Sequence, residues 1–354
     1  MTPNDQTSLT HRFLLADLLK QVSRSFYLTL TVVPGRVRKP IGLAYLFARA
    51  ADTIADTDLI DRDYRLEFLR RFKAQFTGRV NWADIRAIKE ALVPHQAQTA
   101  ERRLIESLEE CFRLYLNLEA VDRLRMNGLM ETLTNGMEMD LTEFSGSTVK
   151  DLTALSTAAD LDRYIYYVAG RVGEFWTEMM CAHLPALAKW DGPRMAPIGV
   201  RFGKGLQLTN VLKDVARDLQ RGRCYIPRSL LEEAGLKPDD LLEPHNRDVF
   251  QPVLVKLIAV ARDHLDQGWL YTMAIPRREL RLRLACMWPI LFAGETLRLV
   301  SSAPNLLDPT VNVKISKRRV YGIMALTTLT GGCSLIGTAY WGRLRKLLGN
   351  DASL

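Results

Sequence analysis

The stretch YLFARAADTIAD (residues 45–56) and a later one, QLTNVLKDVARD, decide the fold, because both have helical periodicity and both carry a D-x-x-x-D motif. The first motif contains Asp52 and Asp56, and the second contains Asp214 and Asp218. Residues four apart lie on one face of a helix, so each motif presents two carboxylates side by side. Like charges so placed destabilise a helix unless a cation neutralises them, and Mg²⁺ suits this role.

One such motif arises easily by chance and is compatible with a solvated helix face. Each pair, however, continues a longer polar stripe: Tyr45 and Arg49 precede the first pair, and Gln207 and Asn210 precede the second, at spacings of three or four. Both helices are otherwise apolar, and a polar stripe on an apolar helix is expected to line a cavity with partners. Two such stripes predict a metal–diphosphate site inside a helical bundle.

Helical periodicity dominates the 354 residues, and no sustained two-residue alternation indicates a sheet. We expect helices over 39–58 and 196–220 around the two motifs, and further helices over 10–33 and 159–183. No long flexible linker separates them. The sequence therefore predicts one compact all-α domain over residues 1–354.

Lysine and arginine number 48 against 40 acidic residues, a net charge of +8. This excess fits a phosphate-bearing ligand, nucleic acid or an anionic membrane surface. A nucleic-acid binder is disfavoured because no recognisable motif is present. Five scattered cysteines without a C-x-x-C pair indicate a reducing compartment, and the N-terminus lacks a signal-peptide pattern, so a cytoplasmic location is predicted.

The C-terminal part is expected to form a last helix over about 317–348. Its segment 322–341 has twenty residues without a charge and basic residues on both sides. That length is sufficient to cross a membrane, but threonines and glycines weaken partitioning, so a core helix is favoured over a span. Surface attachment through the basic end is a third interpretation.

Basic residues beside the stripes are candidates to neutralise diphosphate oxygens: Arg49, Lys213, Arg217, Arg221 and Arg223. Of these, Arg217 and Arg221 are expected to be surface charges, and Arg223 is the better candidate. The segment DRYIYYVAGRVGEFW places Tyr164, Tyr167 and Arg171 on one helix face, with small residues that allow close packing. A tightly packed core helix is the alternative interpretation of that segment.

Taken in order, the segments VSRSFYLTL (22–30), YLFARAADTIAD (45–56), YIYYVAGRVGE (164–174) and QLTNVLKDVARDLQRGRCYIP (207–227) resemble the squalene/phytoene synthase family. The resemblance implies an isoprenoid-synthase-type helical bundle with a central apolar cavity. It also implies head-to-head condensation of two molecules of farnesyl diphosphate to presqualene diphosphate, with Tyr164 near the proton that is lost. The implied magnesium ligands are Asp52, Asp56, Asn210, Asp214 and Asp218. The implied substrate-binding residues are Ser23, Arg24, Tyr45, Arg49, Gln207, Asn210 and Arg223.

Within the family, CMWPILFAGETL (286–297) and VKISKRRV (313–320) are most similar to the squalene synthases. This similarity implies a second step in which NADPH reduces the intermediate to squalene, as a farnesyl-diphosphate farnesyltransferase does. The residues implied for cofactor or phosphate contacts are Arg49, Lys213, Lys314 and Lys317. Two positions depart from the pattern: Ala55 replaces an acid, and Ser316 replaces the arginine usual in the NADPH segment, which weakens the NADPH assignment.

Two alternatives stay open. The chain is either a reductive enzyme or one that stops at presqualene diphosphate, dehydrosqualene or phytoene. A non-enzymatic assembly protein is disfavoured because all four aspartates of the two D-x-x-x-D motifs are present. We expect a monomer. Peripheral contact with the cytoplasmic face of a membrane is a further possibility that the sequence leaves open. Substrate chain length depends on the depth of the cavity and is not fixed by these motifs.

Overall fold

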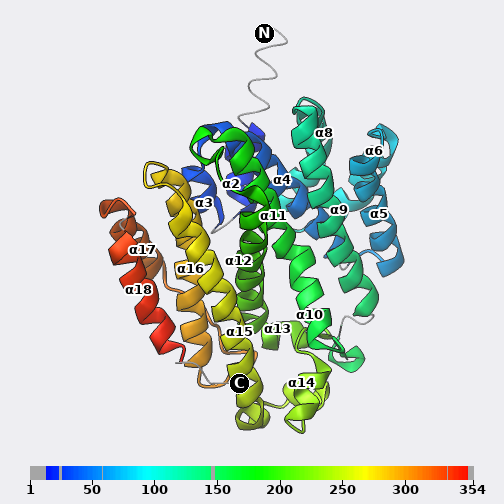
Figure 1. The fold of residues 1–354 in the computed structure, drawn as a ribbon. Coiled ribbons are helices and arrows are strands. Elements are labelled where there is room, and N and C mark those ends of the chain that lie inside the picture. Colours follow the sequence, from blue (N-terminus) through cyan, green and yellow to red (C-terminus); the bar gives the residue numbers. More distant parts are fainter. Residues whose placement is uncertain (1–12, 24–25, 58, 145–147, 333, 350–354) are drawn as a thin grey trace. The chain divides into compact units, whose positions relative to one another are not determined.

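The computed structural model describes residues 13–23, 26–57, 59–144, 148–332 and 334–349, and their regular structure is almost wholly helical (Figure 1). The chain divides into two compact units. Unit 1 comprises residues 1–141 with 178–188, and unit 2 comprises 142–177 with 189–354. The predicted all-α class is confirmed, and the single-domain organisation stays a prediction.

The helices that begin before residue 142 follow one another with short connections. They are a π-helix (Phe13–Leu18), α2 (Leu19–Val22), α3 (Phe26–Val32), α4 (Gly35–Ala55), α5 (Arg62–Thr77), α6 (Trp82–Leu92), a 3₁₀ turn (Val93–His95), α7 (Thr99–Glu106), α8 (Leu108–Leu116) and α9 (Ala120–Glu143).

The remaining elements include two very short strands. In order they are a 3₁₀ turn (Val149–Asp151), β1 (Thr153–Ala154), α10 (Ala158–Ile165), a π-helix (Tyr166–Gly170), α11 (Arg171–His183), a 3₁₀ turn (Pro185–Leu187), α12 (Gly192–Lys213), α13 (Val215–Leu219), β2 (Arg223–Cys224), α14 (Arg228–Glu233), 3₁₀ turns (Pro238–Leu242 and Pro244–Asn246), α15 (Arg247–Ala274), α16 (Leu280–Ser301), α17 (Lys317–Leu329) and α18 (Ser334–Leu347). The strands pair in parallel, with Thr153 opposite Arg223.

In unit 1, helix α4 is held by an aromatic cluster on its apolar side. Phe47 is fully buried, and the centroids of neighbouring rings in the cluster lie 4.7–6.2 Å apart. The partner rings come from α5 and α8 and are Phe72, Phe76, Phe112 and Tyr115. Each favourable ring pair contributes about 0.5–1.5 kcal/mol beyond area burial. The cluster therefore fixes the rotation of α4 about its axis and thereby the direction of its opposite, polar face.

In unit 2, helix α12 packs against the segment that runs from α10 through the π-helix into α11, as well as against α15 and α16. The contact is made by backbone. A methyl carbon built on Gly173 would lie 1.9 Å from the carbonyl oxygen of Gly199, and one on Gly203 would lie 2.2 Å from that of Ala169. We call this contact the glycine seam. It confirms the close packing predicted from the small residues of this segment.

The expectation of one long helix over 317–348 is wrong. The chain forms α17 and α18, separated by a turn in which Gly331 and Gly332 have φ of +59° and +62°. Residues with side chains rarely adopt this left-handed conformation, so the two glycines allow a reversal that breaks the helix. Neither helix is buried as a core helix is: on α17 only Ile323 and Thr327 are buried.

Two other predicted helices are interrupted. The region 10–33 contains separate helical segments with a break at Ser23, and the predicted helix 196–220 is divided at Asp214 into α12 and α13. At Asp214 the hydrogen-bond ladder nevertheless continues, because the Asp218 N–H donates to the Asp214 carbonyl at 3.0 Å. The four-residue relation between these two aspartates is therefore preserved.

One helix in the described part of the chain is long and apolar enough to cross a membrane, and it is α16 rather than the segment 322–341. Of its most apolar window, 67% is buried inside the fold. This burial is typical of a helix in the core of a folded unit.

Candidate functional site

The predicted polar stripe on α4 exists in unit 1. Between positions 41 and 55, the side chains that are not buried are those of Tyr45, Ala48, Arg49 and Asp52. Asp56 follows at the end of the helix, is exposed, and donates its N–H to the Asp52 carbonyl at 2.8 Å. The polar residues spaced three or four apart in the sequence thus form one accessible strip on α4, and this strip ends in two carboxylates.

Burial of the Asp52 carboxyl, followed by repulsion from Asp56, raises the pKa of Asp52 to about 7. Its side chain nevertheless remains 44% exposed, so the group has solvent access although protein surrounds it. A carboxylate in these surroundings is readily neutralised by a proton or by a cation. The first pair therefore has the electrostatic character expected of a metal ligand.

Arg49 is shared between two acids. Its Nη1 lies 3.5 Å from Asp52 Oδ2, and its Nη2 donates to Glu101 of α7. Burial lowers the pKa of Arg49, but the nearby Asp52 and Glu101 outweigh this and raise it overall. The carboxyl of Asp52 therefore interacts with one arginine, Arg49, and with two other carboxylates, those of Asp56 and Glu101.

The segment before this stripe is joined to it by Tyr45. The Tyr45 hydroxyl donates to the carbonyl of Val22 at 3.4 Å, next to Ser23. Ser23 is 2% exposed, and its hydroxyl donates to the Leu19 carbonyl, so in this conformation it is part of the packing at the end of α2. Arg24, the other predicted residue of this segment, lies outside the described residues.

The second pair belongs to unit 2 and is surrounded by cations. Asp214 Oδ2 lies 3.2 Å from Lys213 Nζ and 3.2 Å from Arg217 Nη2. Arg217 was expected to be a surface charge, and its side chain is indeed 63% exposed, yet it pairs with the predicted ligand. Upstream on α12, Gln207 is half-buried and Asn210 is exposed, so both are accessible.

Asp218 has a raised pKa of about 6, caused by burial and then by the charge of Asp214. Arg217, Arg223 and Arg221 oppose this shift. Arg223 comes near because Gly222, with φ of +74°, turns the chain from α13 into β2. A methyl carbon on Gly222 would lie 2.6 Å from the Thr148 carbonyl oxygen. Arg223 is therefore half-buried near Asp218, whereas Arg221 is exposed, and the phosphate-binding role of Arg223 stays a prediction.

Tyr164 lies at the end of α10 and is 6% exposed. Its ring stacks on that of Tyr225, with centroids 4.7 Å apart and planes inclined by 24°. Phe144 meets Tyr225 edge-on at 5.0 Å. Because Tyr225 follows Arg223 by two residues, unit 2 brings Tyr164 and the end of the second motif into one neighbourhood.

The segment predicted to contact a nicotinamide cofactor leads into α17. Lys314 and Lys317 are exposed, and Ser316 accepts a hydrogen bond from the N–H of Arg319 at 3.2 Å. Ser316 is therefore the N-cap of α17, a role that arginine does not perform. Arg319 is fixed in turn by the buried carboxylate of Glu295, at 3.0 Å from its Nε.

Each acid pair by itself offers two carboxylates, and in the described part of the chain no group of three or more histidine, cysteine or acidic residues clusters as a metal site. Mg²⁺ is usually held by one or two carboxylates together with water and substrate phosphates. The donor sets of both pairs fit this pattern. Whether the two pairs act on one ligand stays a prediction.

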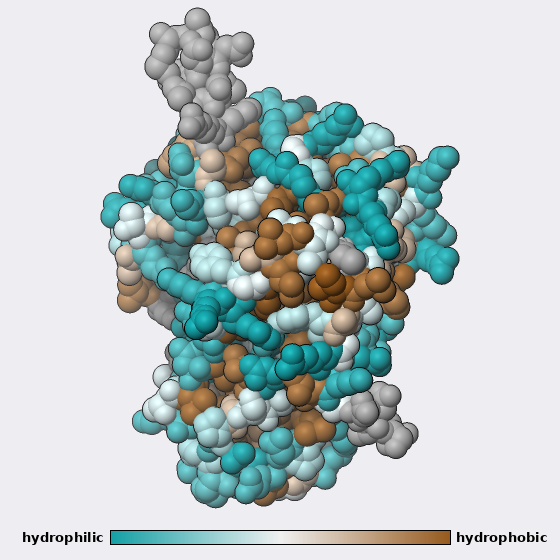
Figure 2. Space-filling model, turned by 90° about the vertical axis from the view of Figure 1, so that its left-hand side faces the viewer, coloured by the Kyte–Doolittle hydropathy of each residue, from teal (hydrophilic) through white to brown (hydrophobic). Residues whose placement is uncertain are grey.

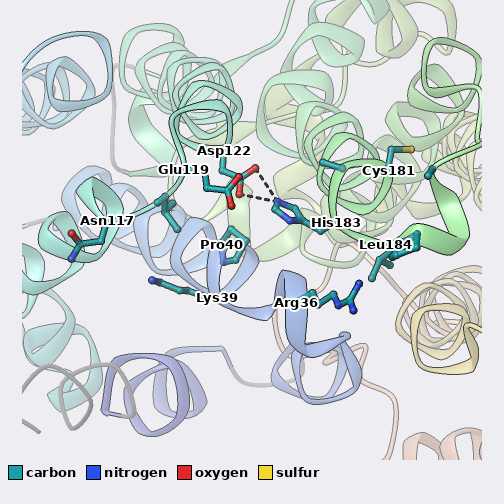
Figure 3. Close-up of a pocket in the computed structure, with 13 residues that line it drawn as sticks. Arg36, Lys39, Pro40, Asn117, Glu119, Asp122, Cys181, His183 and Leu184 are labelled. Carbon is teal, nitrogen blue, oxygen red and sulfur yellow. Dashed lines mark hydrogen bonds and ion pairs between the residues drawn. The ribbon is translucent and has the colours of Figure 1, made fainter. Parts of the chain in front are cut away.

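A pocket of about 750 Å³ in unit 1 is lined by none of the predicted site residues (Figure 3). One of its acids, Asp122, is buried and accepts from His183 at 2.8 Å and from Arg125 at 2.8 Å. Its cations Arg36 and Lys39 begin α4, whereas Asp52 ends it, roughly 20 Å further along the helix at 1.5 Å per residue. The pocket is thus separate from the acid stripe, and of its two acids, Asp122 and Glu119, Asp122 is paired with His183 and Arg125.

Two residues of the site neighbourhoods are absent from the sequence-based predictions. Glu101, the partner of Arg49, lies 52 positions away and carries no local signal. Tyr225, the partner of Tyr164, lies inside the CYIP segment, where its place directly after the second motif was the available signal.

Comparisons with known proteins agree with the resemblance of the motifs. The family model described as squalene/phytoene synthase matches residues 19–319. The chain is 31% identical over 252 residues to the bifunctional lycopene cyclase/phytoene synthase of Arthroderma gypseum, covering 71% of this chain and 39% of that protein. It is 25% identical over 334 residues to the squalene synthase of Cyberlindnera jadinii, covering 94% of this chain and 70% of that one.

Among solved structures, the complex of TcSQS with the ligand E5700 superposes with a TM-score of 0.76 at 22% identity. The alignment covers 97% of this chain and 93% of that one. At this identity the likeness concerns the fold, and it agrees with the isoprenoid-synthase-type architecture expected from the sequence.

Proposed function

Because this chain belongs to the squalene/phytoene synthase family, we propose that it joins two molecules of farnesyl diphosphate head to head and reduces the product to squalene. In the first step the carbon–oxygen bond of the donor breaks, pyrophosphate leaves, and the allylic carbon bonds to the double bond of the acceptor. Loss of a proton closes the cyclopropane of presqualene diphosphate. In the second step the remaining pyrophosphate would leave, and a hydride supplied by NADPH would give squalene.

The observation that carries the proposal is the accessible acid strip of α4. Asp52 and Asp56 end this strip, and burial together with the charge of Asp56 raises the pKa of Asp52, so a divalent cation that neutralises the pair is favoured. Bound Mg²⁺ would neutralise the substrate diphosphate and stabilise the charge that develops on the leaving group. Tyr45 and Arg49, on the same strip, are proposed to contact the diphosphate.

The second pair is proposed to act on the diphosphate together with the first. Asp214 and Asp218, with Asn210, provide further oxygen ligands. Cationic side chains surround the pair, and they can hold phosphate oxygens that the metal leaves free. The residues proposed for these contacts in unit 2 are Gln207, Lys213 and Arg223, and Ser23 and Arg24 are proposed to close over the diphosphate.

Tyr164 is proposed to lie near the proton that leaves when the cyclopropane forms. Its stack on Tyr225 holds the ring in one orientation, as a group that exchanges a proton at a defined atom requires. Released pyrophosphate is the alternative base. The apolar and aromatic neighbours of Tyr164 exclude water from the carbocation.

The reductive step is supported by the similarity to squalene synthases along most of the chain. Lys314 and Lys317 are proposed to bind phosphates of NADPH, with Arg49 and Lys213 as further contacts. Because Ser316 caps α17 where arginine is usual, one phosphate contact is replaced by a structural role. An enzyme that stops at presqualene diphosphate, dehydrosqualene or phytoene is the second candidate, favoured by the phytoene synthase relative.

One experiment tests the proposal and separates the candidates. Purified protein is incubated with farnesyl diphosphate and Mg²⁺, with and without NADPH, and the products are identified by mass spectrometry. We expect squalene with NADPH, and presqualene diphosphate or dehydrosqualene without it. A 30-carbon product that does not change when NADPH is added supports an enzyme that stops at presqualene diphosphate or dehydrosqualene. Because phytoene has 40 carbons, a parallel incubation with geranylgeranyl diphosphate tests that product, and no consumption of either diphosphate refutes both candidates.

A further inference from the structure

The hairpin formed by α17 and α18 has an uncharged tip. From position 322 to position 341 the sequence has no charged residue, and the turn at Gly331–Gly332 lies in the middle of this run. The two helices have 13 and 14 residues, roughly 20 Å each. Each is therefore too short to cross a bilayer, which requires about 20 residues.

Large apolar side chains at this tip are exposed. Leu329 is 87% exposed and Leu335 is 79% exposed, one on each side of the turn, and Leu326 and Ile336 are 39% and 40% exposed. Figure 2 views the side of the molecule on which α17 and α18 lie, and there hydrophobic surface gathers in a patch bordered by hydrophilic surface. Contiguous exposed apolar surface of this kind is typical of an interaction site.

Positive charge lies beside the tip. A methyl carbon built on Gly332 would lie 2.9 Å from Leu280 Cδ1, and the buried Arg283 donates from Nη2 to Ser334 Oγ at 3.0 Å. The hairpin turn therefore lies next to the turn between α15 and α16, and Figure 1 shows both turns at the same end of unit 2. Residues 277–281 of that turn carry three arginines and one glutamate, a net charge of +2.

Of these arginines, Arg277 and Arg278 are exposed, and neither forms an ion pair with a described residue. Protruding leucines beside unpaired arginines are the combination that binds the interface of an anionic bilayer, where apolar side chains enter the acyl boundary and cations meet lipid phosphates. A fluid bilayer accommodates exposed leucines from two helices without a shaped pocket, and its anionic phosphates complement the neighbouring arginines. We propose that the tip of the α17–α18 hairpin, with Arg277 and Arg278, docks on the surface of an anionic lipid bilayer.

The test uses the full chain and sedimentation with vesicles of phosphatidylcholine alone or mixed with an equal amount of phosphatidylglycerol. We expect the wild-type protein to sediment with the mixed vesicles and to be released by high salt. The double variant Leu329→Glu/Leu335→Glu should lower the partition coefficient roughly a hundredfold, since the loss of each leucine side chain lowers it by roughly a factor of ten. Arg277→Gln/Arg278→Gln should lower it by about fivefold per arginine, and on mixed vesicles only.

Leu124→Glu is the matched control, because Leu124 is also an exposed leucine, at 71%, on α9. It should bind vesicles as the wild type does. All substituted side chains are exposed, so thermal unfolding should be unchanged; the single variant Leu329→Ser replaces the double variant if the latter unfolds. Vesicle binding needs no turnover, so its outcome is independent of the proposed reaction.

The proposal is overturned if the wild type does not sediment with the mixed vesicles, or if Leu329→Glu/Leu335→Glu binds them as the wild type does. Sedimentation velocity without lipid measures whether the protein forms a dimer through this surface. A dimer that the leucine substitutions dissociate would show that a second copy covers the tip, and this result would also overturn the proposal.

Discussion

The ring of Tyr164 stacks on the ring of Tyr225 at 4.7 Å, and so a residue of α10 is oriented by one that follows the second acid motif. If this stack positions the Tyr164 hydroxyl, Tyr225→Phe should leave turnover of farnesyl diphosphate nearly unchanged. Tyr225→Ala should lower turnover and reduce the free energy of unfolding by about 3 kcal/mol, because it leaves a cavity.

Tyr164→Phe tests the hydroxyl itself. The stack is retained, so chemical denaturation should show a loss of at most about 1 kcal/mol. Turnover should fall by at least about 100-fold, the usual contribution of a group that transfers a proton. If Tyr164→Phe turns over like the wild type, pyrophosphate is the base and the role proposed for Tyr164 is wrong.

The raised pKa of Asp52 predicts a pH-dependent gain of stability in Asp52→Asn. Between pH 4 and 7 the folded protein holds a proton on Asp52 that the unfolded chain has lost, so this residue makes folding less favourable as the pH rises. In EDTA at pH 8, Asp52→Asn should be more stable than the wild type by about 1 kcal/mol, allowing for solvent screening. Below pH 4 the gain should vanish, as thermal unfolding measured at both pH values will reveal.

Adding Mg²⁺ provides the control for that measurement. The cation should raise the melting temperature of the wild type at pH 8 more than that of Asp52→Asn. Equal stability of the two proteins at every pH, with and without Mg²⁺, would contradict the assignment of Asp52 as a metal ligand.

Asp56→Asn and Asp214→Asn should each abolish the first half-reaction without unfolding the protein. The reason is that each removes one oxygen ligand while keeping the size of the side chain. Release of pyrophosphate from farnesyl diphosphate measures the effect. Arg221→Gln is a suitable control, since Arg221 is exposed and is not proposed to bind substrate, and near-normal release by either aspartate variant would rule out the metal-binding interpretation.

Ser316→Arg should separate the structural from the cofactor role of this position. The substitution removes the N-cap of α17, which should cost about 1 kcal/mol of stability. It also restores the arginine usual in squalene synthases, so the KM for NADPH should fall while the first half-reaction is unchanged. An unchanged KM would mean that the segment 313–320 does not contact the cofactor.

The sequence predicts the arrangement of site residues most accurately where all of them belong to one helix. The stripe of Tyr45, Arg49 and Asp52 follows from helical spacing alone, because the buried positions of α4 alternate with it at the same period. The partnership of Arg49 with Glu101 depends on tertiary packing and has no local signature.

The sequence does not predict the turn between α17 and α18, because its residues also suit a continuous helix. A Gly-Gly pair within an uncharged run is compatible with a continuous helix by composition, and only the positive φ angles at Gly331 and Gly332 distinguish a turn. Similarly, the π-helix at Tyr166–Gly170 and the break at Asp214 are small departures that the helical period does not reveal.

The glycine seam gives a final prediction on stability. Gly203→Ala places a methyl group against the Ala169 carbonyl, so it should lower the free energy of unfolding by about 2 kcal/mol or more. Gly342→Ala on α18 meets nothing within 4 Å and should raise it by about 0.5–1 kcal/mol. Urea denaturation of both variants measures the contrast, and equal effects would contradict direct backbone contact.

Because the seam joins main chain to main chain, the spacing between α12 and the helix that follows Tyr164 does not depend on side-chain rotamers. We therefore expect the second acid pair and this tyrosine to keep a constant separation. Related enzymes that make products of another chain length should therefore differ at residues outside the glycine seam and keep its glycines.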